Sequence, residues 1–175
     1  MKIVEPKYEI LTDISEGGIK ELQQIERVAR VCYKSEDKIT LDGESAKKLV
    51  GFLVKQGHEA MLEHSQLSVL FTCDRAIANE LVRHRIASYS QQSQRYVGEH
   101  DFEAIVPPSI AARPEAAAKF AALMSQIRMA YEELTDLGIP KEDARYVLAN
   151  ATETKVVITM NARTLFHFFS LRCCM

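Results

Sequence analysis

Residues 83–96 read RHRIASYSQQSQRY, and the rest of the chain is predicted to hold this stretch in place. No acidic residue occurs from Arg83 through Gly98. A segment this polar and basic cannot drive folding by burial. Arginine forks match phosphate oxygens in pairs, serine hydroxyls can complete such a cradle, and amides such as Gln91 and Gln92 can bind the polar edge of a ring. The pattern indicates either a site for an anion with a polar ring attached or a solvated surface loop.

The composition limits the class of protein. The chain has 175 residues, of which 47% are hydrophobic, and this fits a single globular domain with a core. A formal net charge of -2 argues against a nucleic-acid partner. The opening MKIVEPKYEI and the short apolar runs predict neither a signal peptide nor a membrane span, so we expect a cytoplasmic protein. The four cysteines form no C-x-x-C pair, which argues against a disulfide framework or a zinc ribbon.

Upstream of the basic stretch, alternation and helical periodicity predict two strands and three helices. The strands cover Tyr8–Ile14 and Gln66–Cys73, and the helices cover Ile19–Tyr33, Ser45–Gln56 with Ser45 as its cap, and Asp74 to about Arg83 with Asp74 as its cap. The third helix is predicted to bury Ile77, Ala78, Leu81 and Val82. The basic stretch would then follow this helix as a loop.

Downstream, the pattern predicts two strands, two helices and a last helix with the sequence NARTLFHFFSLR. The segments are Asp101–Ile105 (strand), Pro114–Leu137 (helix), Lys141–Asn150 (helix), Thr154–Met160 (strand) and the helix that begins at Asn161. Helices dominate, and the strands do not alternate strictly with them. This predicts an α+β fold with helices packed around a mainly antiparallel sheet in a single domain.

The last helix carries a charge at the end of an aromatic stripe. An ideal helix places Arg172 on the same face as Leu165, Phe168 and Phe169. A cation there is costly unless an anion or a polarised carbonyl meets it. The alternative is that Arg172 complements the helix C-terminus and extends into water. The opposite face carries Arg163, His167 and Ser170, a pattern more typical of a solvated face.

The segment GHEAMLEH, Gly57 to His64, holds two histidines and two glutamates, but its spacing does not match H-E-x-x-H, so no metal site is expected. His58 follows a helix and could pack on a planar ligand or cap that helix. No nucleophile stands out, because the serines lack a G-x-S-x-G elbow and Cys73 is predicted to face the core. The absence of G-x-G-x-x-G and Walker sequences argues against Rossmann and P-loop nucleotide sites.

Three segments together resemble one family. RHRIASYSQQSQRY is similar to the signature of the flavin-dependent thymidylate synthases, which is Arg-His-Arg, seven residues and a serine, with arginine and tyrosine following. GHEAMLEH resembles that family's segment upstream of the signature, and NARTLFHFFSLR resembles its downstream helix. The resemblance runs in order from about Ala29 to Arg172.

The resemblance implies a fold, a reaction and partners. Members of this family are α+β homotetramers with FAD at subunit interfaces and shared active sites. They convert dUMP to dTMP, with methylenetetrahydrofolate as the carbon donor and NADPH as the reductant through the flavin. They use no essential cysteine nucleophile, which agrees with the lack of one here.

The resemblance also implies the site residues. Those that would meet FAD are His58, Arg83, His84, Arg85, Gln91, Asn161, Arg163 and His167. Those that would meet dUMP are Glu80, Arg83, Gln91, Gln92, Ser93, Gln94, Arg95, Arg145 and Arg172, with Ser93 and Arg95 near the phosphate. Arg172 would be the catalytic cation, because a fixed positive charge beside the uracil ring stabilises negative charge as C5 becomes nucleophilic.

The chain departs from the family pattern at several positions. Gln91 stands where Glu is frequent, Glu80 where Gln is common, and Ala60 where Thr is frequent. Family chains continue past the Leu-Arg pair into another helix, whereas this sequence stops at Met175. We therefore keep a second expectation, a truncated or degenerate member that binds FAD or dUMP without turnover. A third and weaker one, RNA binding by the basic loop, is opposed by the net charge.

Overall fold

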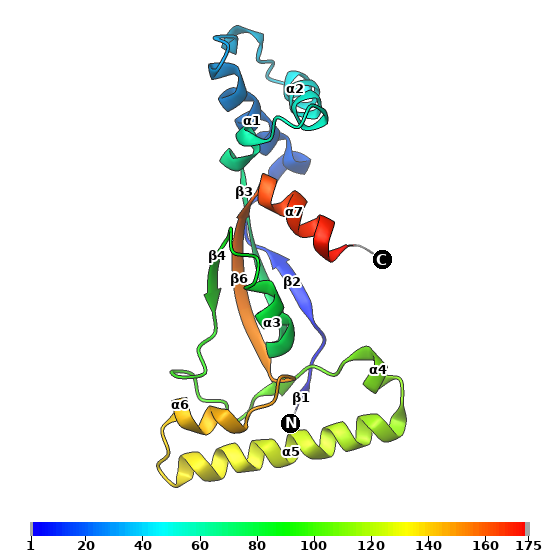
Figure 1. The fold of residues 1–175 in the computed structure, drawn as a ribbon, viewed down its shortest axis with the longest axis vertical. Helices are drawn as coiled ribbons and strands as arrows, with labels where there is room; N and C mark the ends of the chain where they lie inside the picture. The colour runs from blue at the N-terminus through cyan, green and yellow to red at the C-terminus, as the bar shows by residue number, and fades with distance from the viewer. Residues whose placement is uncertain (1, 174–175) are drawn as a thin grey trace. The chain divides into compact units, whose positions relative to one another are not determined.

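The computed structural model describes residues 2–173, and their backbone contacts divide them into two compact units. Unit 1 comprises residues 2–9, 70–85 and 89–157, and unit 2 comprises residues 10–69, 86–88 and 158–173. The secondary structure is a mixture of helices and a mostly antiparallel sheet, which confirms the predicted α+β class. Figure 1 labels the elements along the chain.

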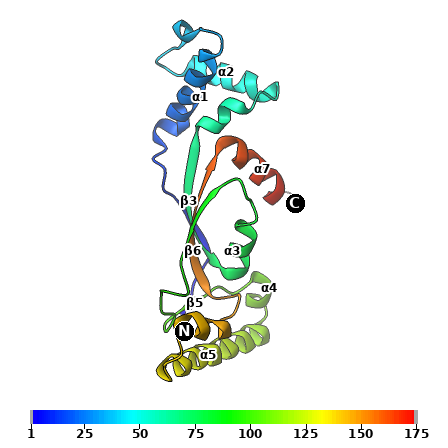
Figure 2. The same ribbon diagram turned by 60° about the vertical axis from the view of Figure 1, so that its left-hand side comes forward.

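The main sheet has four strands in the order β2-β3-β6-β4. Their bounds are Lys7–Ile10 (β2), Gln66–Asp74 (β3), Glu153–Asn161 (β6) and Ser88–Gln91 (β4). Both ribbon views show the long strands β3 and β6 side by side (Figures 1 and 2). A second, two-stranded sheet pairs β1 (Lys2–Ile3) with β5 (Glu103–Ala104) in parallel.

The strand predictions need two corrections. β2 ends at Ile10, four residues before the predicted end at Ile14. The basic stretch contains β4 and is therefore not a loop throughout. β4 pairs with β6, and the Gln92 amide extends that pairing by donating to the Lys155 carbonyl oxygen at 2.9 Å. Pairing through the main chain accommodates polar side chains, so the composition of this segment did not reveal the strand.

Unit 1 contains four α-helices and one short 3-10 helix. These are α3 (Arg75–Leu81), α4 (Pro108–Ala111), α5 (Pro114–Asp136), α6 (Lys141–Ala144) and η4 (Arg145–Val147). Figure 1 shows α6 lying along α5. The core of this unit includes Phe102, Ala104 and Met124, which are all buried. The buried Tyr131 of α5 lies close to His100, with ring centroids 5.5 Å apart.

Two helix predictions in unit 1 were wrong in part. The helix predicted from Lys141 to Asn150 ends as α6 at Ala144 and continues only as η4, because Leu148 is extended and begins the return to the sheet. In α3, Ala78 and Leu81 are buried as predicted, but Ile77 and Val82 are exposed. This seven-residue helix buries a narrower face than its sequence pattern indicated.

Unit 2 contains three α-helices and three 3-10 helices. These are η1 (Ser15–Gly18), α1 (Ile19–Val31), η2 (Glu36–Lys38), α2 (Glu44–Lys55), η3 (Ala60–His64) and α7 (Ala162–Arg172). A buried cluster of Ile25, Val50 and Leu62 joins α1, α2 and η3. Ala162 at the start of α7 packs against the same cluster.

The helix caps show where local sequence was sufficient. Asp74 accepts a hydrogen bond from the Ile77 amide at 2.7 Å, so its predicted capping of α3 is confirmed. Ser45 was wrongly predicted as a cap, because α2 begins after Gly43. Gly43 has a φ of 76°, and a Cβ there would lie 2.5 Å from the Ile19 side chain, so only glycine fits.

Candidate functional site

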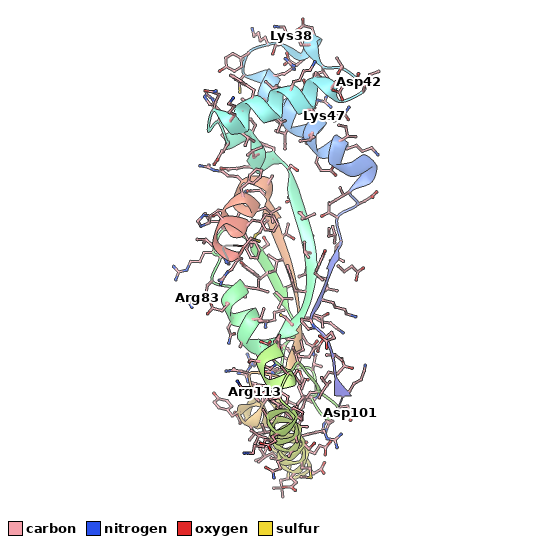
Figure 3. The ribbon with its side chains drawn as sticks, turned by 90° about the vertical axis from the view of Figure 1, so that its right-hand side faces the viewer. Lys38, Asp42, Lys47, Arg83, Asp101 and Arg113 are labelled. Atoms are coloured by element: carbon pink, nitrogen blue, oxygen red, sulfur yellow. The ribbon has the colours of Figure 1, made fainter. Side chains whose placement is uncertain are left out.

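The first predicted site residues of the basic stretch lie at the C-terminal end of α3. Arg83, which is labelled in Figure 3, donates to Glu80 at 2.8 Å. Both side chains are exposed. The Tyr89 hydroxyl bonds to the Leu81 carbonyl oxygen at 2.9 Å and also contacts the carbonyl oxygen of His84. Burial of this phenol raises its pKa, so it remains a neutral donor. Tyr89 therefore fixes the turn that carries the Arg-His-Arg triplet.

The two glutamines of the stretch are bound in different ways. Among the described residues, Gln91 is one of a few that bury a side-chain polar atom with no hydrogen-bond partner, in this case the amide nitrogen Nε2. Gln92 is held within unit 1, because its Nε2 donates to Glu99 at 3.4 Å and its carbonyl oxygen accepts from Arg75 at 3.4 Å. Gln91 thus keeps a buried donor without a partner in the described part of the chain, whereas Gln92 anchors the chain.

Two arginines predicted to contact dUMP, Arg95 and Arg145, meet at one residue of α6. Arg95 donates to the carboxylate oxygen Oε2 of Glu142 from Nε at 3.0 Å and from Nη2 at 2.9 Å. Arg145 donates from Nε to the main-chain oxygen of the same Glu142 at 3.0 Å. The turn before Arg95 is closed by Ser93, whose hydroxyl accepts from the Arg95 amide at 3.2 Å. The structure therefore brings Ser93, Arg95 and Arg145 into one neighbourhood.

Two buried acids and one partly buried arginine lie in the same unit. Burial raises the pKa of Glu99, and the neighbouring Glu153 raises it further, whereas Gln92 and Arg75 lower it. Burial lowers the pKa of Arg75, with nearby Arg145 acting in the same direction and Glu99 opposing it. Arg75 and Glu99 thus sit close enough to act on one another beneath the stretch that carries Gln92 and Ser93.

In unit 2, an ion-pair cluster joins α7 to η3. Arg163 contacts Glu63 at 2.5 Å and Glu59 at 3.3 Å, and these carboxylates raise the pKa of the guanidinium. The Ala162 amide donates to the Ser65 carbonyl oxygen at 2.9 Å. The segments GHEAMLEH and NARTLFHFFSLR, which are far apart in sequence, therefore lie next to each other.

The remaining predicted residues of unit 2 have separate roles in the structure. Asn161 caps α7 by accepting from the Thr164 amide at 2.8 Å, at the position where the last helix was predicted to begin. The His58 amide donates to the Leu53 carbonyl oxygen at 2.9 Å at the end of α2, and the His58 side chain is exposed. His167 is exposed, and Arg172 is the exposed last residue of α7. In the predicted aromatic stripe, Phe168 is half-buried and Phe169 is exposed.

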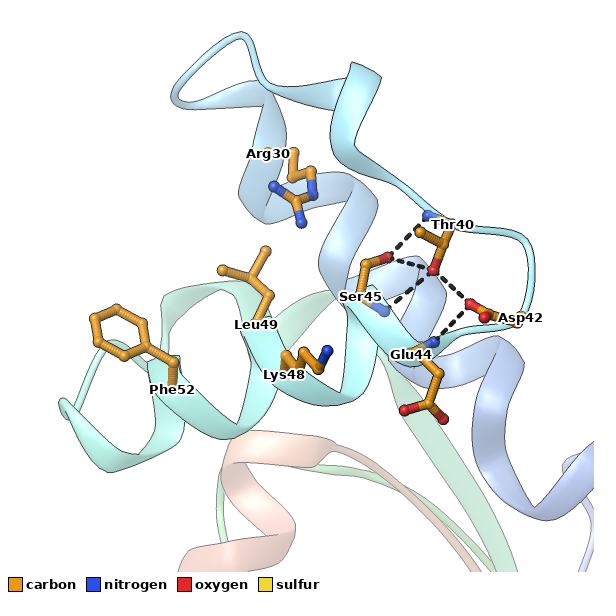
Figure 4. Close-up of a pocket in the computed structure, with 8 residues that line it drawn as sticks. All are labelled: Arg30, Thr40, Asp42, Glu44, Ser45, Lys48, Leu49 and Phe52. Atoms are coloured by element: carbon orange, nitrogen blue, oxygen red, sulfur yellow. Dashed lines mark hydrogen bonds between the residues drawn. The ribbon is translucent and has the colours of Figure 1, made fainter.

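A cavity of about 580 Å³ in unit 2 is lined by residues outside the predicted site (Figure 4). Its polar groups bind one another: the Thr40 amide donates to the Ser45 hydroxyl at 2.9 Å, and the Glu44 amide donates to Asp42 at 3.0 Å. The buried Glu26 accepts from both Arg30 and Ser45 at 2.8 Å. This network fixes the connection between α1 and α2.

Three other features were considered within residues 2–173: a reactive cysteine, a metal site and a membrane-spanning helix. Cys73 is buried, and desolvation raises the pKa of its thiol to about 11, so it stays protonated at neutral pH. The described residues contain no group of three His, Cys, Asp or Glu side chains placed to hold a metal ion. In that same part of the chain, no helix is long and apolar enough to cross a membrane.

Sequence reasoning missed three residues at the site in unit 1, which are Arg75, Glu99 and Glu142. Glu99 had a signal, because it is the first carboxylate after the long stretch that lacks acids. Arg75 and Glu142 had no signal in the sequence, because their contacts are with residues far along the chain. The contact between Arg95 and Glu142, for example, spans 47 positions. His84 and Arg85 lie in the irregular segment between α3 and β4, and Gln94 lies in the turn that follows Ser93.

Comparisons with known proteins agree on one family. The family model described as "Thymidylate synthase complementing protein" matches residues 19–175. A "Flavin-dependent thymidylate synthase" from Geobacter sulfurreducens is 44% identical over 153 residues, covering 83% of this chain and 66% of that protein. A relative of the same name from Nitratidesulfovibrio vulgaris is 40% identical over 146 residues, covering 77% of this chain and 59% of that protein. The chain thus spans two thirds or less of the length of these two curated relatives.

A solved structure shares the fold. The crystal structure of a UMP/dUMP methylase, PolB from Streptomyces cacaoi, bound with 5-Br dUMP, has a TM-score of 0.81 and 24% identity, and the match covers 98% of this chain and 80% of that one. The architecture of the four-stranded sheet and its helices is therefore an established one. Together with the match over residues 19–175, these findings show that the chain belongs to the thymidylate synthase complementing protein family.

Proposed function

We propose that this protein is a flavin-dependent thymidylate synthase. In this reaction dUMP, methylenetetrahydrofolate, NADPH and a proton give dTMP, tetrahydrofolate and NADP⁺. The observation that carries the proposal is the family match over residues 19–175, which includes the whole basic stretch, together with relatives named for this activity. The UMP/dUMP methylase named above supports a uracil nucleotide as the substrate class.

The residues of unit 1 are suited to the nucleotide. Ser93, Arg95 and Arg145 lie together around Glu142, and two guanidinium forks with a hydroxyl form a suitable cradle for a phosphate. The pair between Arg95 and Glu142 is about half exposed on both sides, so a phosphate dianion can displace the carboxylate at little cost. In this proposal Gln92, Gln94 and Glu80 line the same nucleotide site.

The chain also offers groups that fit a flavin. Gln91 buries an amide donor without a protein partner, which suits an acceptor atom of a ring. Arg83 is exposed on its turn, and with His84 and Arg85 it would bind the pyrophosphate and ring of FAD. In unit 2 we assign His58, Asn161, Arg163 and His167 to the same cofactor. When bound, FAD would supply the hydride chemistry, with NADPH as the source of electrons.

Arg172 is the proposed catalytic residue. A guanidinium beside the uracil ring favours the enolate-like form of the base, in which negative charge is spread toward C5. C5 then becomes the nucleophile that takes up the one-carbon unit, and no protein nucleophile is required. The high pKa of the buried Cys73 thiol agrees with that scheme.

The proposal extends to assembly and compartment. We expect the enzyme to be a homotetramer with shared active sites, to use a folate as co-substrate and to be located in the cytoplasm. The many apolar side chains exposed on the single chain, such as Ile86, Phe166 and Phe169, suit burial between subunits.

The first test is an absorbance spectrum of the purified protein, repeated after addition of FAD and then of dUMP. The proposal predicts flavin bands that stay with the protein through gel filtration and shift when dUMP is added. A protein that remains colourless in excess FAD would contradict it. Formation of dTMP in the presence of methylenetetrahydrofolate and NADPH separates an enzyme from a family member that binds FAD or dUMP without turnover.

A further inference from the structure

A buried carboxylate lies beneath the nucleotide residues of unit 1, and the proposed function does not use it. Glu99 is 5% exposed, and its carboxylate accepts from the Gln92 side chain at 3.4 Å. Its main-chain amide donates to the hydroxyl of Tyr131 at 3.2 Å, and Tyr131 is fully buried in α5. The Glu99 backbone is thereby fixed to the core of the unit.

Arg75 provides the opposite charge in the same place. Its Nη1 donates to the Gln92 carbonyl oxygen at 3.4 Å and to the Thr154 hydroxyl at 3.3 Å, and Thr154 is buried in β6. Its main-chain amide donates to the Thr152 carbonyl oxygen at 3.1 Å. The two charges counteract the effect of burial on each other, since Arg75 lowers the pKa of Glu99 and Glu99 raises that of Arg75.

Gln92 is therefore bound at its amide, its carbonyl oxygen and its side chain. The Lys155 carbonyl oxygen accepts from the Gln92 amide at 2.9 Å. Arg75 donates to the Gln92 carbonyl oxygen, and Glu99 accepts from the Gln92 side chain. The turn that carries the proposed phosphate residues begins at the next position, Ser93, whose carbonyl oxygen accepts from the Val97 amide at 3.0 Å. The place of this turn is thus set by how firmly Gln92 is held.

We infer that Glu99 is a positioning residue that acts through Gln92, with Arg75 as its counter-charge, to fix the Ser93–Val97 turn for the phosphate of the substrate. This inference rests on the proposed function. Each contact at 3.4 Å is weak by itself, but loss of the carboxylate would leave the partly buried side-chain donor of Gln92 without its acceptor and would remove the negative charge that opposes the desolvation of Arg75. The turn would then sample several positions, and binding of the phosphate would have to select one.

The test compares two variants of the full chain. Glu99→Leu removes the acceptor, and loss of one partly buried hydrogen bond to a carboxylate predicts about a tenfold rise in KM for dUMP with little change in kcat. Glu99→Gln keeps an acceptor oxygen, so its KM should stay within about threefold of the wild type. Glu103→Gln is the matched control, because it removes a carboxylate of the same unit that bonds to Lys2 instead.

Hydrogen exchange gives a readout that needs no substrate. In Glu99→Leu, the amides of residues 93–97 should exchange about tenfold faster, while those of β6 keep the wild-type rate. Gln92→Leu removes the donor from the other side and should have the same effect, which keeps the test available if Glu99→Leu does not fold. If both variants keep wild-type exchange in residues 93–97 and a wild-type KM, the inference is overturned.

Failure of the proposed function would look different. In that case the wild-type protein would neither bind nor convert dUMP, and the exchange rates of the ligand-free variants would still decide whether Glu99 holds the turn. A rise in KM that appears equally in Glu103→Gln would overturn the inference, since it would show a general effect of charge removal.

Discussion

The two units hold their predicted site residues in different ways. In unit 1, Gln92 is bound by β6, by the partly buried Arg75 and by the buried Glu99, so the turn that follows it is attached to the interior. In unit 2, Arg163 is about half exposed and is held by two carboxylates, Glu59 and Glu63, that are similarly exposed.

This difference indicates two kinds of binding surface. Buried polar contacts are costly to break, because the groups left behind lose both their partner and water. Exposed ion pairs contribute little to stability and rearrange readily. The backbone at Gln92 in unit 1 is thus fixed before a ligand arrives, whereas Arg163 of unit 2 can exchange its carboxylate partners for a ligand.

The largest expected effect comes from unit 2. Arg172→Ala should lower kcat for dTMP formation by about 10²–10³, because it removes a charge that acts on the base during reaction. Retention of FAD should be unchanged, as checked by the flavin absorbance after gel filtration. Arg27→Ala, which removes an exposed arginine of α1 in the same unit, is the control. Near-normal turnover in Arg172→Ala would show that another group activates the base.

A smaller effect is expected from Arg95, the arginine of unit 1 that is proposed to bind the phosphate. Arg95→Ala should raise the Kd for dUMP by roughly tenfold or more, since a charge-assisted bond to phosphate is lost, with isothermal titration as the measurement. Glu142→Gln breaks only an exposed ion pair and should change the Kd by less than about fivefold. Equal losses in both variants would mean that Glu142 is needed to place Arg95, and the contrast between units would weaken.

Asn161 separates a structural role from a ligand role. Its side chain caps α7, so Asn161→Ala should cost about 1 kcal/mol in the free energy of unfolding, measured by urea denaturation. Asn161→Asp keeps an oxygen acceptor at the cap and should preserve stability while changing flavin affinity. If Asn161→Ala proved as stable as the wild type, the cap would not contribute to folding.

The smallest effect concerns a buried acid of unit 1. Burial is the main cause that raises the pKa of Glu153, and its Oε1 has no hydrogen-bond partner among the described residues. A raised pKa means that the folded state binds its proton more tightly. The stability contributed by the neutral acid is therefore present below the ordinary pKa of 4.5 and is lost as the pH rises through the raised value.

Glu153→Gln should remove this loss. Its Tm should exceed that of the wild type at neutral pH, and the two proteins should converge below about pH 4.5, where both side chains are uncharged. Thermal melts across this pH range provide the measurement. A variant that melts below the wild type at neutral pH would show that the ionised carboxylate has a stabilising partner.

Much of the fold followed from sequence period and capping. The long helix α5, the strand β6, the cap Asp74 and the start of α7 at Asn161 could be predicted, because each depends on residues that are near one another in the sequence. The strand β4 could not, since main-chain pairing with β6 leaves little trace in polar side chains.

The contacts of the candidate site could be predicted less well from local sequence patterns. The basic stretch was found from its composition and its family resemblance, but the residues that hold it were not. Glu142 meets Arg95 across 47 positions, and Arg75 meets Gln92 across 17, so no local period links these partners. Gly43 replaced the predicted cap Ser45 for a similar reason, because the close approach of Ile19 decides that position.

The most direct test of the central claim is transfer of a labelled carbon. The wild-type protein is incubated with FAD, NADPH, dUMP and methylenetetrahydrofolate labelled at its one-carbon unit, and the nucleotide is analysed by mass spectrometry. The proposed function predicts labelled dTMP that depends on each component and is lost in Arg172→Ala. Unchanged dUMP from a folded, flavin-loaded protein would contradict it and would favour the family member that binds without turnover.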